Sequence, residues 1–261
     1  MVILLLNLIK NCKDEDFSAD TKKCREVEFF HSCKDLLSRH GNSTDGVYSL
    51  KSVTSEEDYD VYCHMTDIET CGGGGWTLVM KLDGNKNTFI FDSPLWTNKE
   101  TYAIQDGLEG LAEKESKLAS YWNTPFTKIC LGMSYNGDKK WMTFDYNASS
   151  LYGVIADGQF RPTTAGRGKW KSLITGSSLQ YNCNMNGFNV QFNSKGTMRF
   201  GIVANNDNGC ESCDSWLGIG TSFHYSHDSW TKEMVCGNYA NCCNPDNGSK
   251  YLKTFGFIFV Q

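Results

Sequence analysis

The chain has 261 residues, and 40% of them are hydrophobic, which is enough to bury a proper core and argues against a disordered chain. Its 25 Lys and Arg are scattered among 30 Asp and Glu, for a net charge of −5, so no basic surface indicates nucleic acid or an anionic membrane as a partner. Twelve cysteines in a polar, turn-rich sequence favour an oxidising compartment and therefore a secreted, extracellular protein.

The N-terminal 25 residues differ in character from the rest of the chain. Residues 1–9 are an apolar run, too short to span a membrane, which we interpret as a short secretory signal, with a buried strand as the alternative. Residues 10–25 are polar and resemble a tether, and their Cys12 and Cys24 either pair with each other or link chains into a homo-oligomer. We therefore expect a signal-like segment and tether over 1–25 and one domain over 26–261. No later stretch is long and apolar enough to span a bilayer.

The domain is expected to open with a short helix and three strands, over 26–40, 47–51, 60–65 and 76–82. Gly41 closes the helix as a C-terminal glycine. Four successive glycines, Gly72 to Gly75, form a junction before the third strand, because glycine reaches positive φ and allows close approach of other backbone. Trp76 directly after them is predicted to anchor the core.

One long helix and five strands are predicted after residue 82. The helix covers 108–122, where apolar residues recur at helical spacing and Glu113 and Lys117 form an i,i+4 pair. The strands alternate or run apolar between Asn-Gly, Gly-Asp and Asp-Gly turns, over 128–133, 141–146, 189–193, 198–203 and 254–260. Residues 204–250 lack such a pattern, and a long irregular segment inside a compact domain is usually functional.

The order of the N-terminal elements carries a family resemblance. A helix-like segment holds Cys33, a Val-Tyr-Cys-His-Met strand holds Cys63, and the four glycines precede Trp-Thr-Leu-Val. This order resembles the opening of the fibrinogen-related C-terminal domain, and the four-glycine version is most similar to its intelectin-like relatives. The resemblance implies an α+β, fibrinogen C-terminal-like fold with a mixed central sheet, short helices and a loop-rich, disulfide-bonded C-terminal region. It also implies a disulfide between Cys33 and Cys63.

The segment from Asn205 to Asp214 is the best candidate for a calcium site. Calcium takes about six to eight oxygen ligands, and this turn is dense in carboxylates and amides. In the family that the chain resembles, an Asp-x-Asp-Asn-Asp turn before a cysteine binds calcium, and here an amide replaces the first carboxylate. The expected ligands are Asn205, Asp207, Asn208, Glu211 and Asp214. The alternative is that these are turn residues making Asx hydrogen bonds.

The C-terminal cysteines are expected to form disulfides whose connectivity the sequence leaves open. The residues predicted to be bridged are Cys210, Cys213, Cys236 and Cys242, with Cys243 adjacent. Zinc is an alternative, with His224 and His227 nearby, although the gaps do not match a zinc ribbon. A thioredoxin-like redox role for the Cys-x-x-Cys sequence lacks the surrounding βαβ pattern.

Aromatic residues gather in the same region, between Ser, Asp and Asn. Sugar rings present apolar CH faces and polar edges, so an aromatic platform beside directional oxygens suits a lectin pocket. The predicted ligand-binding residues are Trp216, His224, Tyr225, Trp230 and Tyr239. A core position is the alternative for each of them. Predicted glycosylation sites at Asn42, Asn147 and Asn247 agree with a secreted glycoprotein.

Together these features predict a secreted, calcium-assisted recognition domain that binds extracellular carbohydrate or acetylated groups, as in innate immunity or adhesion. The alternative is a non-catalytic structural protein of the extracellular matrix that binds protein partners. Elution from a mixed-sugar resin by EDTA favours the lectin, and retention only by matrix proteins favours the alternative. No catalytic residue is predicted, because the sequence has no Gly-x-Ser-x-Gly elbow, no His-Glu-x-x-His and no phosphate-binding loop.

Overall fold

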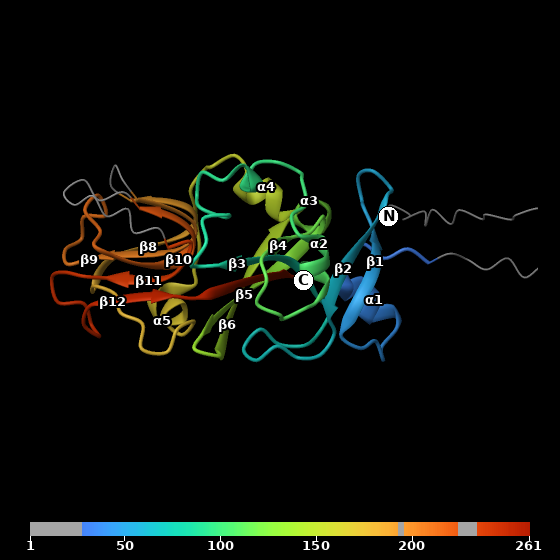
Figure 1. Cartoon of the computed structure of the whole chain (residues 1–261), viewed down its shortest axis with the longest axis horizontal. Helices are drawn as coiled ribbons and strands as arrows, with labels where there is room; N and C mark the ends of the chain where they lie inside the picture. The colour runs from blue at the N-terminus through green and yellow to red at the C-terminus, as the bar shows by residue number, and fades with distance from the viewer. Residues whose placement is uncertain (1–27, 193–195, 224–233) are drawn as a thin grey trace, which may run out of the picture.

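The computed structural model describes residues 28–192, 196–223 and 234–261. The chain forms two antiparallel sheets (Figure 1). In the first sheet the strand order is β1-β2-β3-β13-β5-β6, with β4 paired to β3. Its strands are β1 (Gly46–Lys51), β2 (Asp58–His64), β3 (Trp76–Asp83), β4 (Ser116–Lys117), β5 (Phe126–Tyr135), β6 (Asp138–Ala148) and β13 (Phe255–Val260). The second sheet has the order β12-β11-β10-β9-β8-β7. Its strands are β7 (Arg161–Pro162), β8 (Asn182–Phe192), β9 (Gly196–Asn205), β10 (Ser215–Phe223), β11 (Cys236–Ala240) and β12 (Lys250–Lys253).

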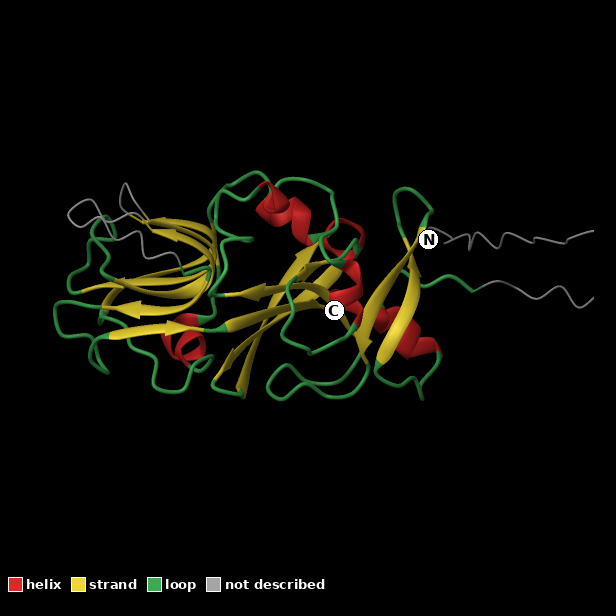
Figure 2. Ribbon diagram, in the orientation of Figure 1, coloured by secondary structure: helices red, strands yellow, loops and turns green. Residues whose placement is uncertain are grey.

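The helices are short and surround these sheets (Figure 2). They are α1 (Cys33–Arg39), the 3₁₀ turn η1 (Pro94–Trp96), α2 (Ile104–Leu108), α3 (Ser120–Asn123), α4 (Leu151–Ile155) and α5 (Gly166–Lys171). Helix α1 begins at Cys33 because the Ser32 hydroxyl accepts a hydrogen bond from the backbone N–H of Asp35, 3.0 Å away. None of the described helices combines the length and the apolar character that crossing a membrane requires.

The last strand ties the two sheets together. After β6 the chain leaves the first sheet, builds the second, and returns so that β13 lies between β3 and β5 (Figure 1). At the return, the N–H of Thr254 donates to the carbonyl of Cys236 in β11, and the carbonyl of Thr254 accepts from Gly84. The C-terminal region is therefore held by hydrogen bonds to both sheets.

The largest hydrophobic cluster combines side chains from both sheets. It includes Met80 of β3, Leu131 of β5, Phe200 of β9 and Leu217 of β10, all fully or almost fully buried. A second cluster packs α1 against the first sheet, including its β1–β2 hairpin, and it contains Trp76, which is completely buried as predicted. This burial of apolar surface is the main favourable term in folding.

The predicted α+β class, with short helices and several disulfides, is confirmed by these elements. The predicted strands all lie within or overlap observed ones, and the short N-terminal helix corresponds to α1. Every described strand pair is antiparallel, so the sheet differs in strand direction from the mixed sheet that we expected. The division at residue 25 stays a prediction, because residues 1–27 lie outside the described part of the chain.

The long helix predicted over 108–122 is wrong. The chain instead forms the end of α2, the short strand β4 and α3. The backbone of Gly110 is left-handed, with φ of 65°, and Lys81 Nζ donates to the carbonyls of Asp106, Gly110 and Ala112 at 2.6–3.0 Å. Lys117 pairs with β3 and its ammonium donates to Asn98, so the predicted pair with Glu113 does not form. Tertiary hydrogen bonds to a buried lysine here override local helical spacing.

The prediction that residues 204–250 are irregular is also wrong. The described part of that range contains β10 and β11, and β12 begins at its end. Several core-facing positions of these strands hold Gly, Ser or Asn, so the hydrophobic alternation that identifies strands is weak. At Gly218, for example, an added Cβ would lie 2.3 Å from the carbonyl oxygen of Phe200 in β9. Close packing of backbone on backbone therefore replaces apolar side chains there.

The glycine junction makes a testable steric prediction. A Cβ at Gly74 would lie 1.5 Å from the carbonyl oxygen of Met65, whereas a Cβ at Gly73 would meet nothing within 4 Å. We expect Gly74→Ala to lower the free energy of unfolding by about 2–3 kcal/mol, because the backbone must shift. Gly73→Ala, the matched control, should change it by less than about 0.5 kcal/mol. Urea denaturation checks this, and equal midpoints for the two variants would contradict it.

Candidate functional site

The predicted calcium turn connects β9 to β10 and is held in place by its own contacts. Asn205 ends β9 and Ser215 begins β10, and a disulfide joins Cys210 in the turn to Cys183 in the neighbouring strand β8. The side-chain Nδ2 of Asn182 donates to the backbone carbonyl of Asn206 at 2.7 Å. The turn is therefore fixed to β8 by a covalent bond and a hydrogen bond.

The side chain of Asn205 fills the centre of this turn. Asn205 is completely buried, and its Nδ2 lies 2.9 Å from Oδ1 of Asp207, 2.6 Å from the carbonyl oxygen of Gly209 and 3.0 Å from Oγ of Ser212. Its Oδ1 accepts a hydrogen bond from the backbone N–H of Asn206 at 2.9 Å. Oδ1 of Asp207 also accepts a hydrogen bond from the N–H of Gly209 at 2.8 Å. This is an Asx-turn hydrogen bond, the alternative to a calcium site at these residues.

The arrangement of these side chains does not fit a calcium ion at the position that the sequence predicts. The three oxygens that would be its ligands converge on an amide nitrogen, which is a hydrogen-bond donor and cannot coordinate a cation. The carboxylates of Glu211 and Asp207 both lie beside Gly209, where an added Cβ would be 3.1 Å from Oε2 of Glu211 and 3.2 Å from Oδ1 of Asp207. The Asn208 side chain is exposed and no hydrogen bond of it is described, and Asp214 turns toward Cys242, 3.1 Å from its sulfur.

The disulfides differ in part from those predicted. The described bridges are Cys33–Cys63, Cys71–Cys130, Cys183–Cys210 and Cys242–Cys243. The first is the pair that the family resemblance implies, whereas the bridge between Cys71 and Cys130 was not anticipated. Cys213 and Cys236, both predicted to be bridged, are buried free thiols.

Local surroundings explain why these two thiols are free. Cys213 Sγ lies 3.7 Å from Sγ of Cys183, which is already bonded to Cys210. Burial, and then the negative charges of Asp214, Glu211 and Asp207, raises the pKa of the Cys213 thiol to about 12. Cys236 is enclosed in the main core, where its sulfur lies 3.1 Å from the hydroxyl oxygen of Thr254. Burial likewise raises the pKa of the Cys236 thiol to about 12, so both thiols are protonated and unreactive at neutral pH.

In the described part of the chain, the cysteines of the zinc alternative do not come together as one metal site. Among the described residues, metal-ligating side chains gather within 4.8 Å of one another at Asp214, Cys242 and Cys243, and those two cysteines are bonded to each other. Cys236 lies in the main core and does not belong to this group. His224 and His227 lie outside the described residues.

The predicted aromatic platform is buried where the structure describes it. Trp216 is 2% exposed and Tyr239 is 8% exposed, and their rings stack with centroids 6.2 Å apart in a cluster on the second sheet. This differs from the predicted ligand platform, because Trp216 and Tyr239 lie on strands β10 and β11 and not in an irregular loop. The other predicted ligand residues, His224, Tyr225 and Trp230, lie outside the described residues.

An exposed aromatic residue that sequence reasoning missed lies beside the turn. Tyr181, immediately before β8, is 63% exposed, and the guanidinium of Arg167 lies 5.7 Å from the centre of its ring. Asn184 Nδ2 donates to the carbonyl of Tyr181 at 2.8 Å. A single tyrosine before a weakly patterned strand gives no sequence signal that separates it from a core residue.

Arg167 is itself held rigidly beneath the tyrosine. It donates to the carbonyls of Leu179 and Gln180 and to the carboxylate of Asp246, which also accepts from Lys171. Burial alone would raise the pKa of Asp246, but hydrogen bonds from Lys171, from the N–H of Leu179 and from Arg167 outweigh it and lower that pKa. Asp246 therefore stays ionised at neutral pH and fixes α5 against the C-terminal loop.

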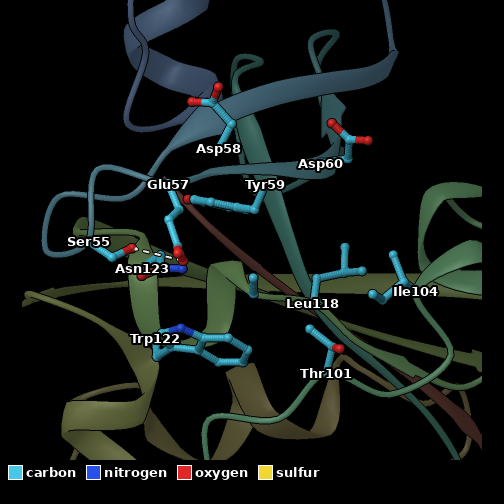
Figure 3. A pocket seen from close by; sticks show the side chains of 11 residues that line it. Ser55, Glu57, Asp58, Tyr59, Asp60, Thr101, Ile104, Leu118, Trp122 and Asn123 are labelled. Carbon is cyan, nitrogen blue, oxygen red and sulfur yellow. Dashed lines mark hydrogen bonds between the residues drawn. The ribbon is translucent and has the colours of Figure 1, made fainter.

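A pocket of about 390 Å³ lies away from these residues, between β2, α3 and the loop that leads to α2 (Figure 3). Figure 3 shows Asp58 and Asp60 on one side of it, Glu57 extending toward Asn123, and the apolar side chains of Leu118 and Trp122 opposite the two aspartates. Asp58 is paired with Lys51 at 3.8 Å. No residue of the predicted site lines this pocket, so it is a separate candidate for binding.

The predicted glycosylation sites are all at the surface. Asn42, Asn147 and Asn247 are exposed, as attachment of a glycan requires. The side-chain Nδ2 of Asn247 donates to the carbonyl of Gly176 at 2.8 Å, whereas no hydrogen bond is described for the side chain of Asn42 or Asn147. Glycosylation itself stays a prediction.

Comparisons with known proteins find similar sequences and similar structures, and no protein-family model matches the chain. Human angiopoietin-2 is 27% identical over 84 residues, which is 32% of this chain and only 16% of angiopoietin-2. The fibrinogen-like globe domain of human ANGPTL2 has a TM-score of 0.40 and 16% identity, with 89% of this chain and 98% of that domain covered. Identities of 27% over a third of the chain and 16% overall do not establish a family, so membership of the fibrinogen-related family is a proposal.

Proposed function

We propose that residues 26–261 form a fibrinogen-related, intelectin-like recognition domain that is secreted and binds extracellular carbohydrate or acetylated groups. The disulfide between Cys33 and Cys63, at the position that the family resemblance implies, supports the family. Four bridges and three exposed glycosylation sites support an extracellular location. Innate recognition and adhesion are the roles that we expect for such a domain.

The exposed ring of Tyr181 is the observation that carries this proposal. A ring that is 63% exposed offers an apolar face to a sugar or an acetyl methyl group. Arg167 lies beside the ring, and the amides of Asn182 and Asn184 each donate one described internal hydrogen bond, which leaves each a second N–H and an amide oxygen for hydroxyl or carbonyl groups. The Cys183–Cys210 bridge and the ion pair of Arg167 with Asp246 fix these groups before a ligand arrives, which reduces the entropy lost on binding.

Substitution of Tyr181 tests the proposal. We expect Tyr181→Ala to weaken binding to the best ligand of a glycan array by about tenfold or more, because the stacking surface is lost. Phe160→Ala is the matched control, since Phe160 is also exposed, at 42%, and should leave affinity unchanged. Surface plasmon resonance with the same ligand measures both variants. Unchanged affinity of Tyr181→Ala would show that the ligand binds elsewhere.

The matrix-protein alternative is favoured by the pocket beside β2. Its acidic side and its apolar surface at Leu118 and Trp122 suit a lysine or arginine side chain with its aliphatic stem, as a protein partner would supply (Figure 3). Retention of the chain by matrix proteins but by no sugar resin would select this function over recognition of glycans.

A further inference from the structure

We propose that the side-chain amide of Asn205 takes the place of a cation in the β9–β10 turn, so that this turn is complete without calcium. Its Nδ2 contacts one carboxylate, one carbonyl and one hydroxyl oxygen, at Asp207, Gly209 and Ser212, within 2.6–3.0 Å. An ion would occupy the same point with the same oxygens at about 2.3–2.6 Å. The partial positive charge of the amide hydrogens replaces the positive charge of the ion.

The neighbours of Asn205 fix which end of the amide points inward. Oδ1 accepts from the backbone N–H of Asn206 at 2.9 Å. If the amide were turned round, Nδ2 would face that N–H, donor against donor, and Oδ1 would face the carboxylate of Asp207 and the carbonyl of Gly209. A bound cation would remove only the second conflict. The first would persist in a side chain that is completely buried, where an unpaired donor is costly.

An aspartate at position 205 would behave differently, because both of its oxygens are acceptors. One oxygen can accept a hydrogen bond from the N–H of Asn206. The other can then coordinate a cation together with the ring of oxygens, by which we mean those of Asp207, Gly209 and Ser212 around position 205. Without a cation, however, the carboxylate at 205 would face Oδ1 of Asp207, where Nδ2 of Asn205 now lies 2.9 Å away. Like charges at that distance repel each other. The single change Asn205→Asp should therefore convert a calcium-independent turn into a calcium-dependent one.

Calcium titration of the full chain and of this variant is the test. For the wild-type protein, isothermal titration calorimetry should show no saturable binding up to about 5 mM calcium. For Asn205→Asp we expect a dissociation constant of about 0.1–1 mM, the range of extracellular calcium modules. Its melting temperature in EDTA should lie below that of the wild type and rise by about 2–4 °C in 5 mM calcium.

Asn206→Asp is the matched control, because it adds the same charge at an exposed side chain for which no hydrogen bond is described. An equal calcium response of Asn206→Asp and Asn205→Asp would overturn the proposal, since added charge alone would then explain the binding. Saturable wild-type binding at millimolar calcium or below would overturn it as well. If Asn205→Asp does not fold, the wild-type titration decides alone. None of these results depends on the identity of the glycan, so the proposal stands or fails separately from the proposed function.

Discussion

Replacing Arg199 with methionine is expected to lower the free energy of unfolding by about 3–5 kcal/mol. Arg199 in β9 is only 4% exposed, and its guanidinium donates to the carbonyl oxygens of Phe91 and Ile155 and to Oδ1 of Asn189 at 2.7–3.2 Å. It also lies 3.9 Å from the ring centre of Phe91. Methionine would leave the buried carbonyl of Phe91 and Oδ1 of Asn189 without their described donor, whereas the Ile155 carbonyl would keep its hydrogen bonds from Gly158 and Asn189. Urea unfolding at neutral pH under oxidising conditions measures the loss.

Arg39→Met provides the control for this variant. Arg39 pairs with Asp35 at 3.0 Å on the exposed face of α1, with 46% of its side chain accessible. Its loss should cost less than about 1 kcal/mol, as for other surface ion pairs. If Arg199→Met were no less stable than Arg39→Met, the hydrogen bonds of Arg199 would not be what joins β9 to the loop before η1.

Removing the Cys71–Cys130 disulfide should have an effect of similar size. The two cysteines are 59 residues apart in sequence, so the bridge closes a long loop between the glycine junction and β5. The chain-entropy relation predicts that replacing both with alanine lowers the free energy of unfolding by about 4 kcal/mol. Both side chains are at most 5% exposed, and the loss of their packing would add to this. Thermal and urea unfolding check the prediction.

The bridge between Cys242 and Cys243 serves as the control, because it closes a very short loop where the Cys71–Cys130 bridge closes a long one. It joins neighbouring residues, so its loss releases little chain entropy and should cost only about 1 kcal/mol. Peptide mapping without reductant would identify both bridges directly. If the two double variants lost equal stability, the difference in loop length would not explain the contribution of the Cys71–Cys130 bridge.

The N-terminal part of the fold could be predicted because its local signals agree with its tertiary contacts. Ser32 caps α1, β2 alternates between exposed and buried residues, and Trp76 follows the glycine junction into the core. The prediction of a long helix over 108–122 was wrong because the spacing of its leucines carries no information about a lysine distant in sequence. Lys81 is fully buried and binds three carbonyls of that segment, an interaction that only the folded chain reveals.

The candidate site could be located from the sequence, but its contacts could not be predicted. The density of Asp, Asn and Gly identified the turn after β9, yet an amide and a carboxylate look alike in such a pattern. Only the hydrogen bonds show that Asn205 points a donor into the ring of oxygens. The prediction of the aromatic platform was wrong for a related reason. Trp216 lies on β10, whose small residues obscure the alternation of apolar and polar positions, and no sequence pattern marks Tyr181 as exposed.

Binding of the full chain to a glycan array, in EDTA and in calcium, tests the central claim most directly. We expect saturable binding to carbohydrate or acetylated ligands that persists in EDTA and is lost in Tyr181→Ala. A blank array with the correctly folded protein in both buffers would contradict the account of a recognition surface around Tyr181.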